Sequence, residues 1–496
     1  MYISKCKIVE SYDLNNKLIN KLLKIIVFCI CFLVTVEQPI TVSAQQRKAT
    51  NTKKTNTKKT APKKKTTPAQ SKRNVPNSHI FLKDSLLAEG ISYKRLIVTI
   101  NGLKHCINLL QVDLTNTKTG IGVVKGGNNI TELERLQTMF ENANVDTSQK
   151  KIVGGINANF WRAYTNYPMG PTIINGEVVE MPSYKKWTST FFNEDGLPFT
   201  SFFNIQGEIL TKTGNRININ SVNRRNNSNG IAVYNKFGGD VIPYINAKKV
   251  QELLIAGLDN VFQSSEVQDS TESVESLAMQ KEELLYAERT SKLEYDLKKI
   301  VVRYIDEPAV NTFIRCEVVD IVNGAVRMPA NGYVLSIGED IDTTQLPQIG
   351  DNIFLHYWTN IHESEIFTNA VCGTPRLVRD GIARHEASEE GSTSRRFING
   401  ALPRTAIGYD KDKTKLFLVT IGKAEGTIGA SLTQMADIME YIGCYTAQNL
   451  DGGGSTNMVI GSDNITNPGV SRKLSVGLAV LSLKNDKTVK LPRKRR

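Results

Sequence analysis

The sequence predicts an α+β fold: a mixed, largely antiparallel β-sheet core flanked by helices, with an inserted helical arm. Three observations lead to this class. Short β-branched segments separated by turn residues run through most of residues 93–240 and 300–358. Residues 431–443 have the periodicity and the end signals of an amphipathic helix. Residues 247–299 are charged, almost free of glycine and helix-favouring, and they interrupt the β-rich sequence.

The β-rich segments begin at residue 93. Two of them, Arg95-Leu-Ile-Val-Thr-Ile-Asn-Gly and Ile107-Asn-Leu-Leu-Gln-Val-Asp-Leu, are rich in β-branched residues and partly alternate between apolar and polar positions. Residues 168–240 contain short strands separated by turns such as Asn175-Gly176, which predicts mostly antiparallel pairing. Strands resume at residue 300 and continue to residue 358.

Two helices are predicted beside these strands. In residues 131–142, Thr131 is the expected N-cap and Glu134 its capping-box partner. In residues 431–443, Ser431 is the N-cap and Gly443 ends the helix. The apolar stripe of this second helix consists of Leu432, Met435, Ala436, Ile438, Met439 and Ile442. The inserted arm, about residues 247–299, is predicted to contain a further amphipathic helix. This helix is either a structural insertion on the β-rich domain or a partner-binding helix.

Residues 1–44 have the pattern of a secretory signal peptide. Lys17, Lys21 and Lys24 precede an apolar run over residues 25–36, and residues 42–44 suit cleavage after Ala44. The run is short for a membrane span, so a retained N-terminal anchor is the alternative interpretation. The sequence therefore predicts an exported protein, periplasmic or extracellular.

A basic segment follows at residues 45–78. It repeats Asn-Thr-Lys-Lys-Thr at residues 51–55 and 56–60 and has almost no apolar residues, which predicts a disordered tether. The tether is either a solvated spacer or contacts an anionic envelope surface electrostatically. Residues 491–496 form a basic tail, and residues 79–490 are predicted to form the folded domain.

The net charge of +13 comes from residues 1–73, which carry 16 Lys/Arg and 3 Asp/Glu. From Asn74 onward the chain carries 46 Lys/Arg and 46 Asp/Glu, so composition gives no indication of nucleic-acid binding. Four cysteines follow the signal segment, and their wide spacing does not favour a zinc site. They leave open up to two disulfides or free buried thiols. These cysteines are Cys106, Cys316, Cys372 and Cys444.

The most informative stretch is Asn449-Leu-Asp451-Gly-Gly-Gly-Ser455-Thr456. Consecutive glycines cost conformational entropy, and a fold keeps them where the backbone approaches a ligand or takes positive φ. Successive amides in such a turn form an anion-binding nest, so we expect a phosphate or sugar-phosphate site beside Asp451. A short strand over residues 447–450 would deliver Asp451 at its C-terminal end. The alternative is a glycine hairpin that joins two strands.

Other motifs precede and follow this stretch in a fixed order. Together they resemble the phosphodiester glycosidase family over about residues 95–483, a family with an N-acetylglucosamine-1-phosphodiester glycosidase and bacterial exopolysaccharide-associated members. Two motifs depart from the family pattern: Asn157-Ala-Asn159-Phe160-Trp161 replaces Asn-Gly-Gly-Phe-Phe, and Cys372-Gly-Thr374 replaces a turn richer in glycine. The remaining motifs are Asn223-Arg224-Arg225, Asn331-Gly332-Tyr333-Val334-Leu335-Ser336, Arg404-Thr405-Ala406-Ile407-Gly408 and Asn467-Pro468 with Ser471-Arg472.

The resemblance implies hydrolysis of the bond between a sugar C1 and a phosphodiester. The implied catalytic residues are Asp451, as nucleophile or as a base that holds water, and Arg404, which would grip phosphate oxygens. The resemblance does not specify a cofactor and leaves a divalent cation open, with Asp451 as its predicted ligand. The remaining candidates for substrate binding are Asn157, Asn159, Thr405, Gly452, Gly453, Gly454, Ser455, Thr456 and Arg472.

The implied partner is a sugar-phosphate-containing glycan, and no nucleic acid is expected. Two other functional classes stay open. One is a non-catalytic glycan-binding protein of the envelope, which sugar release would distinguish from an enzyme. The other is a phosphate-binding hydrolase with an actin-like fold, which needs a second Asp-Gly phosphate hairpin that the sequence before Lys125 does not contain.

Overall fold

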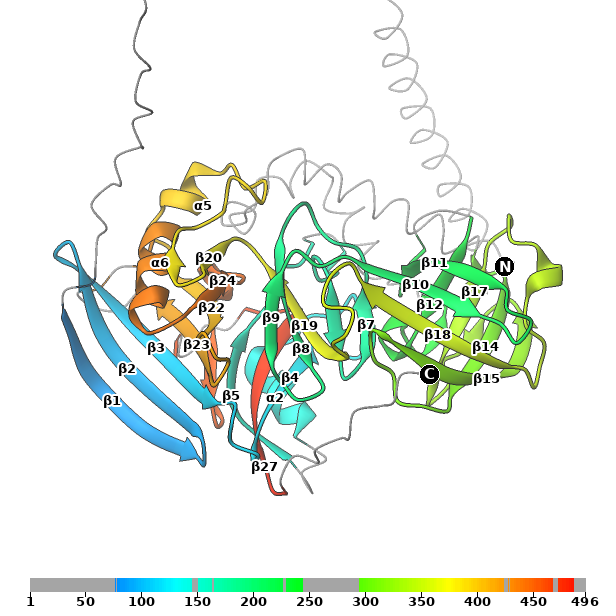
Figure 1. Ribbon diagram of the computed structural model, residues 1–496, viewed down its shortest axis with the longest axis horizontal. Coiled ribbons are helices and arrows are strands. Elements are labelled where there is room, and N and C mark those ends of the chain that lie inside the picture. The colour runs from blue at the N-terminus through cyan, green and yellow to red at the C-terminus, as the bar shows by residue number, and fades with distance from the viewer. Residues whose placement is uncertain are drawn as a thin grey trace, which may run out of the picture. The chain divides into compact units, whose positions relative to one another are not determined.

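The structure is a computed structural model of residues 1–496, shown in Figure 1. It describes residue 76, residues 78–144, 150–162, 165–225, 229–243, 294–422, 427, 429–466 and 472–485. The predicted signal peptide, the basic tail, most of the tether and nearly all of the helical arm lie outside these residues. The described residues all belong to one compact unit, Ser71–Arg496. Among them we find no helix with the length and apolar character of a membrane span.

An eight-stranded antiparallel sheet carries the glycine-rich motif. The two strands predicted from residues 95 and 107 are confirmed as β2 and β3, which pair through ten residues. In spatial order, the strands are β1 (Ser78–Ala88), β2 (Ile91–Ile100), β3 (Leu103–Asp113), β23 (Lys415–Gly422), β22 (Arg404–Tyr409), β24 (Thr446–Asn449), β20 (Arg376–Arg379) and β21 (Ile382–Ala383).

Two five-stranded antiparallel sheets lie next in the fold. The first consists of β26 (Asp463–Asn464), β25 (Met458–Ile460), β5 (Lys150–Asn157), β27 (Val476–Leu483) and β4 (Thr119–Lys125). The second consists of β7 (Glu177–Glu180), β6 (Thr172–Ile174), β19 (Phe367–Gly373), β8 (Thr188–Asn193) and β9 (Pro198–Ser201). The hairpin predicted at Asn175-Gly176 joins β6 and β7, and both turn residues take positive φ.

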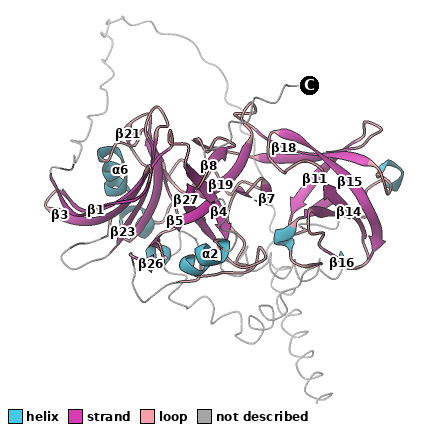
Figure 2. Cartoon of the chain, turned by 90° about the horizontal axis from the view of Figure 1, so that it is seen from below, coloured by secondary structure: helices cyan, strands magenta, loops and turns pink. Residues whose placement is uncertain are grey.

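A closed seven-stranded barrel is inserted between β9 and β19 (Figure 2). Its strands pair antiparallel except for β11 and β12, which are parallel. A two-stranded ribbon accompanies it, made of β13 (Val241–Ile242) and β16 (Val326–Arg327). The barrel strands, in spatial order, are β10 (Ile205–Leu210), β11 (Arg216–Val222), β12 (Ile231–Tyr234), β17 (Gly332–Ile337), β14 (Lys298–Tyr304), β15 (Thr312–Asn323) and β18 (Asn352–Thr359).

The main core lies between sheets. One cluster of buried side chains unites Leu110 and Leu418 of the eight-stranded sheet, Leu478 of the first five-stranded sheet, and Val371 and Phe192 of the second. Because these strands bury their apolar faces against one another, few helices are needed to cover them. The inside of the barrel is filled with aliphatic and aromatic side chains and is continuous with the second five-stranded sheet.

The described residues contain three α-helices: α2 (Leu136–Ala143), α5 (Arg395–Asn399) and α6 (Leu432–Tyr441). They also contain the 3₁₀-helices η1 (Lys236–Gly238), η3 (Thr343–Gln345) and η4 (Gly453–Ser455). The prediction for α6 is confirmed: Ser431 is its N-cap, and Gly443 follows its end. The structure adds that Gln434 completes a capping box with Ser431. The predicted start of the earlier helix at Thr131 is wrong, because Thr131 donates to Asn129 in a turn and α2 begins only at Leu136.

The predicted fold class, an α+β core flanked by helices, is therefore wrong: the chain is mainly β. The apolar strands find their partners in other sheets and in a closed barrel, and α6 is the longest described α-helix, with ten residues. The predicted helical arm lies mainly outside the described residues, and its last residues, Lys298 and Lys299, belong to strand β14. The antiparallel character of the sheets was predicted correctly.

Candidate active site

Strand β24 places Asp451 at the end of a central strand of the eight-stranded sheet. Its four residues lie between β22 and β20, and Leu450 N–H continues the ladder by donating to Thr405 O at 2.8 Å. Helix α6 precedes β24 and packs on β20. Asp451 therefore leaves a rigid, hydrogen-bonded strand directly before the glycines, as the sequence predicts.

At each of the three glycines a side chain would be unfavourable, either because of the backbone φ or because a Cβ would lie close to a neighbouring atom. Gly453 has a φ of +58°, which L side chains rarely adopt. A Cβ on Gly452 would lie 3.0 Å from Pro403 O, and a Cβ on Gly454 would lie 3.1 Å from Nη2 of Arg472. The loop thus packs closely against the chain before Arg404 on one side and against the Arg472 guanidinium on the other.

The loop amides mostly serve the loop itself. Gly452 N–H donates to Asp451 Oδ1 at 2.9 Å, and Gly453 N–H donates to Pro403 O at 2.9 Å. Ser455 and Thr456 N–H close η4 by donating to Gly452 O and Gly453 O. The anion-binding nest expected from the glycine run therefore has most of its amides already engaged in this structure.

Asp451 is a buried carboxyl with polar neighbours. It is 9% exposed, and burial raises its pKa to about 7, against the opposing effects of the Ser455 hydrogen bond, the Arg472 charge and the Gly452 amide. The carboxyl does not point into packed hydrocarbon, because Gly452 and Ser455 both bond to it. Near neutral pH this group exchanges a proton, as a catalytic acid or base must.

Asn157 holds the peptide of Asp451 in place. Its Nδ2 donates to Asp451 O at 2.7 Å, and its Oδ1 accepts from Thr405 Oγ1 at 2.8 Å and from Asn457 N–H at 3.0 Å. One buried amide therefore connects β5, β22 and both ends of the glycine loop. Asn157 and Thr405, which the sequence places among the substrate-binding residues, both lie here with their side chains bonded to protein.

Asn159 lies in a second buried network. Its Nδ2 donates to Thr172 Oγ1 at 2.9 Å and Met169 O at 3.3 Å, and its Oδ1 accepts from Cys372 N–H at 3.2 Å. The motif around Cys372 also contacts β24, since Asn449 Nδ2 donates to Thr374 O at 2.7 Å. Four of the motifs that resemble the family, around residues 157, 372, 404 and 451, are thus brought together.

Arg404 is near the loop, but its guanidinium is engaged elsewhere. The side chain is 1% exposed, and it donates to three main-chain carbonyls: Ala430 O at 2.8 Å, Phe397 O at 2.6 Å and Gly400 O at 3.2 Å. Burial lowers its pKa to about 9. In this structure Arg404 ties α5 and the start of α6 to β22, and its predicted contact with phosphate stays a prediction.

Arg472 is the arginine that faces the loop. Its guanidinium lies against Gly454, its charge acts on Asp451, and its side chain is half-buried. The neighbouring motif residues Asn467, Pro468 and Ser471 lie outside the described residues. Ser455 and Thr456 are buried, and Ser455 is bonded to the Asp451 carboxyl.

Two motifs of the resemblance lie in the barrel and not beside Asp451. Arg225 donates to Glu294, to Ser336 O at 2.8 Å and to Gly230 O at 3.1 Å. Tyr234 donates to the same Glu294 carboxylate at 3.1 Å. These residues form a buried network that closes the barrel, which the sequence pattern alone did not reveal.

Sequence reasoning missed Asn457 and Glu390 as residues that support the site. Asn457 N–H completes the Asn157 network, and its place directly after Thr456 is the only sequence signal for it. Glu390 accepts from Thr188 Oγ1 at 2.6 Å and from Arg376 N–H at 2.7 Å, so it holds the Cys372–Arg376 turn that packs on β24. Burial raises the pKa of Glu390. Its position in a polar loop gave no signal.

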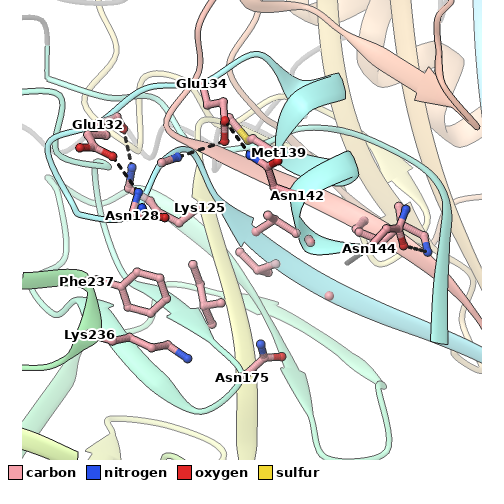
Figure 3. A pocket seen from close by; sticks show the side chains of 18 of the residues that line it. Lys125, Asn128, Glu132, Glu134, Met139, Asn142, Asn144, Asn175, Lys236 and Phe237 are labelled. Carbon is pink, nitrogen blue, oxygen red and sulfur yellow. Dashed lines mark hydrogen bonds between the residues drawn. The ribbon is translucent and has the colours of Figure 1, made fainter. Parts of the chain in front are cut away.

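A separate cavity of about 540 Å³ lies between α2, β4 and η1, and none of its lining residues belongs to the Asp451 loop (Figure 3). Its upper wall in the figure carries Glu132 and Glu134, and Lys236 and Asn175 lie opposite. Lys125 is buried in its wall and donates to Gly126 O at 2.8 Å and Glu132 O at 2.6 Å.

Metal ligands and thiols give little further indication of chemistry. Among the described residues, no group of three or more His, Cys, Asp or Glu side chains is arranged to hold a metal ion. Cys106, Cys316, Cys372 and Cys444 are all buried free thiols, which settles the alternative left open by their spacing.

Residues 317–481 match the family model described as phosphodiester glycosidase. This part of the chain is therefore similar to the phosphodiester glycosidase family. The match contains β19, Arg404, α6, the Asp451 loop and Arg472, and it confirms the family predicted from the ordered motifs. It also contains the barrel strands β17 and β18 and part of β15.

Two curated relatives are similar to part of this chain. The chain is 32% identical over 103 residues to the mouse N-acetylglucosamine-1-phosphodiester alpha-N-acetylglucosaminidase. The aligned residues make up 19% of this chain and 20% of the mouse protein. The chain is 31% identical over 102 residues to the bovine protein of the same name, which covers 19% of each. The chain therefore aligns with about a fifth of the length of these relatives.

A solved structure shows the same fold over more of the chain. A hypothetical protein from Synechocystis superposes with a TM-score of 0.54 at 18% identity, over 81% of this chain and 63% of that one. At this identity the similarity concerns the fold alone, and it extends well beyond residues 317–481.

Proposed function

We propose that this chain is an exported hydrolase that cleaves the bond between a sugar C1 and a phosphodiester. The observation that carries the proposal is the Asp451 carboxyl, with a pKa raised to about 7, in a glycine loop bordered by Ser455 and Arg472. The match of residues 317–481 to the phosphodiester glycosidase model supports the reaction class. The proposed substrate is an N-acetylglucosamine-type sugar-1-phosphodiester in an envelope or exopolysaccharide glycan, in keeping with the names of the two relatives.

The leaving group explains how one carboxyl could suffice. Cleavage of the C1–O bond of a sugar-1-phosphodiester releases a phosphate monoester dianion, whose conjugate acid has a pKa of about 6. This pKa is far below that of an alcohol, so the phosphate departs from C1 with less need for a proton than an alkoxide does. We assign the ionised form of Asp451 to the attack, either directly on C1 or by taking a proton from water. In both routes the C1–O bond breaks, water supplies the new hydroxyl at C1, and the phosphate leaves as a monoester anion.

We assign the phosphate contact to Arg472. Its guanidinium is half-buried and lies against Gly454, where an anion leaving the anomeric carbon beside Asp451 could be paired. Arg404 is the alternative, but a contact with phosphate would require it to give up bonds to the carbonyls of Phe397, Gly400 and Ala430. Arg404 is therefore better suited to a structural role, in which its bonds to these carbonyls hold the chain next to the loop in place.

The experiment that tests the proposal measures sugar release by the purified full chain from a panel of sugar-1-phosphodiesters. Matched alkyl glycosides of the same sugars and sugar-1-phosphate monoesters serve as controls for the leaving group. We expect free sugar from the diesters only. Absence of release from every diester, with and without added Mg²⁺ or Mn²⁺, would contradict the proposal and favour a non-catalytic glycan-binding protein. A parallel arm with chelator tests whether a divalent cation takes part.

A further inference from the structure

A different region of the chain has the features of a ligand site: the outer face of the barrel formed by β11, β10, β18 and β15 (Figure 1). Along β18, Ile353, Leu355 and Tyr357 point into the packed barrel interior. The alternate residues therefore point outward. This outer face does not contribute to the core, yet it carries large aromatic side chains.

Three rings on this face stand parallel to one another. The His356 ring lies 4.0 Å from the Phe313 ring at an interplanar angle of 22°, and 5.1 Å from the Trp358 ring at 25°. Phe313 and His356 are direct cross-strand partners of β15 and β18, and Trp358 is two residues further along β18. The rings thus form a stacked row, in which Trp358 is the last member and is partly exposed.

Polar groups surround the end of this row. A groove of about 270 Å³ is lined by Glu208, Arg216, Asn311, His356, Trp358 and Glu363. Glu208 is only 5% exposed, accepts a hydrogen bond from Arg216 and lies 3.3 Å from Nδ1 of His356. This carboxylate holds the imidazole and the guanidinium in fixed positions before any ligand arrives.

Asn311, another residue that lines the groove, is also fixed by hydrogen bonds. Asn311 Nδ2 donates to Thr359 Oγ1 at 3.0 Å and to Glu365 O at 2.8 Å, and its Oδ1 accepts from Thr359 N–H at 2.8 Å. Glu363 lies on an exposed turn and also lines the groove. The groove therefore combines one available ring with a guanidinium and a carboxylate on rigid supports.

This combination suits a neutral sugar residue. The C–H face of a sugar ring packs on an indole, and vicinal hydroxyls bond in pairs to carboxylates and guanidinium groups. The volume is below the ~300–1,000 Å³ of sites for drug-sized ligands, which fits a single sugar residue. Two carboxylates, Glu208 and Glu363, against one arginine disfavour a phosphate-bearing ligand.

We propose that this barrel face is a glycan-docking site that binds one neutral sugar residue of a polymer by stacking on Trp358. It is a site distinct from the Asp451 loop, with the opposite charge preference, and its existence does not depend on the proposed hydrolysis. In an enzyme that acts on glycans, such a site raises the local concentration of the polymer around the catalytic loop.

The test is binding of the full chain to soluble neutral polysaccharides, measured by affinity electrophoresis and titration calorimetry with glucans, mannans and N-acetylglucosamine oligomers. We expect Trp358→Ala to weaken binding about tenfold or more, because the stacking surface is lost, and Trp358→Phe to restore most of it. Phe81→Ala is the matched control, since Phe81 is an exposed aromatic on β1 of another sheet, 54% exposed. It should bind like wild type.

Further variants keep the proposal open to refutation. Should Trp358→Ala fail to fold, Glu363→Ala changes an exposed side chain and should still weaken binding several-fold. Asp451→Asn should bind polysaccharide normally, and Trp358→Ala should hydrolyse a small soluble phosphodiester normally, so the two proposals fail separately. Unchanged binding in both groove variants, no binding of any polysaccharide, or loss of binding only in Asp451→Asn would overturn the docking site. The rings would then be a cross-strand cluster that stabilises the barrel.

Discussion

Burial shifts the pKa values of Asp451 and Lys125 in opposite directions, and both end near 7. The Asp451 carboxyl is raised to about 7 and the Lys125 amine is lowered to about 7, in both cases mainly by desolvation. Their surroundings differ. Lys125 donates to two carbonyls of the loop that it closes, Gly126 O and Glu132 O. Asp451 lies in a loop of three glycines, beside a hydroxyl and a half-buried arginine.

The comparison shows what a perturbed pKa indicates by itself. Burial shifts both groups, whether or not a ligand can reach them. The backbone does not distinguish them, since both loops hold a glycine at positive φ, Gly127 and Gly453. The difference lies in the neighbours: the Lys125 amine bonds to two carbonyls of its own loop, whereas the Asp451 carboxyl lies beside a hydroxyl and an arginine, within the segment that matches the family model. We therefore assign chemistry to Asp451 and a structural role to Lys125.

The strongest test of this contrast is Asp451→Asn. We expect sugar release to fall at least about a thousandfold, because the attacking group is lost. The protein should melt at the same or a higher temperature near pH 8, since the substitution removes a buried charge whose desolvation costs roughly 4 kcal/mol there.

The matched control is Asp463→Asn, the same change at an exposed aspartate of neighbouring strand β26. It should leave the rate unchanged. Near wild-type release by Asp451→Asn would remove the catalytic assignment, and loss of folding in that variant would give Asp451 a structural role similar to that of Lys125.

The next largest effect should come from Arg472→Met. Loss of the cation beside the leaving phosphate should lower kcat/KM about a hundredfold, with partial recovery in Arg472→Lys. Lys473→Met, an exposed neighbouring cation, is the control. Arg404→Met should instead act on stability, because the carbonyls of Phe397, Gly400 and Ala430 would lose their buried donor. If both variants fold and Arg404→Met lowers kcat/KM more than Arg472→Met does, the phosphate contact would be assigned to Arg404 instead.

A smaller effect is expected from pH alone. Because the ionised carboxyl attacks, kcat/KM should fall about tenfold per pH unit below a pKa of about 7 and level off above it. Stability should change in the reverse sense: the raised pKa of Asp451 means that the folded state binds the extra proton, so this contribution is lost as pH rises from about 4 to about 7. A rate profile that is flat from about pH 5 to about pH 9 would show that Asp451 does not titrate in the rate-limiting step.

The smallest effect on activity is expected for Lys125→Met. Since the amine serves only its own loop, the rate of sugar release should stay within about twofold. The folded-state pKa of Lys125 is lowered, so wild-type stability should increase as pH rises from about 7 to about 10, where the unfolded chain still binds the proton. Melting curves of the variant should show less of this increase. A large loss of activity in a folded Lys125→Met variant would link the cavity of Figure 3 to the reaction.

The sequence by itself determined the local features around Asp451. The Ser431 capping box, the glycine that ends α6 and the strand before Asp451 all depend on residues within a few positions of one another, and each is present in the structure. The need for glycine at residues 452–454 was also predictable, because it follows from backbone geometry. The antiparallel strands followed from the turn residues between them.

The tertiary structure alone decided how these parts are used. Whether strands are covered by helices or by other sheets depends on contacts between distant segments, so the predicted helix-flanked core was wrong and the barrel was not foreseen. The choice between arginines has the same origin: Arg404 meets three main-chain carbonyls, those of Phe397, Gly400 and Ala430, and Arg472 meets Gly454. A guanidinium bonds to whichever acceptors the fold brings near it, and spacing in sequence does not specify those acceptors.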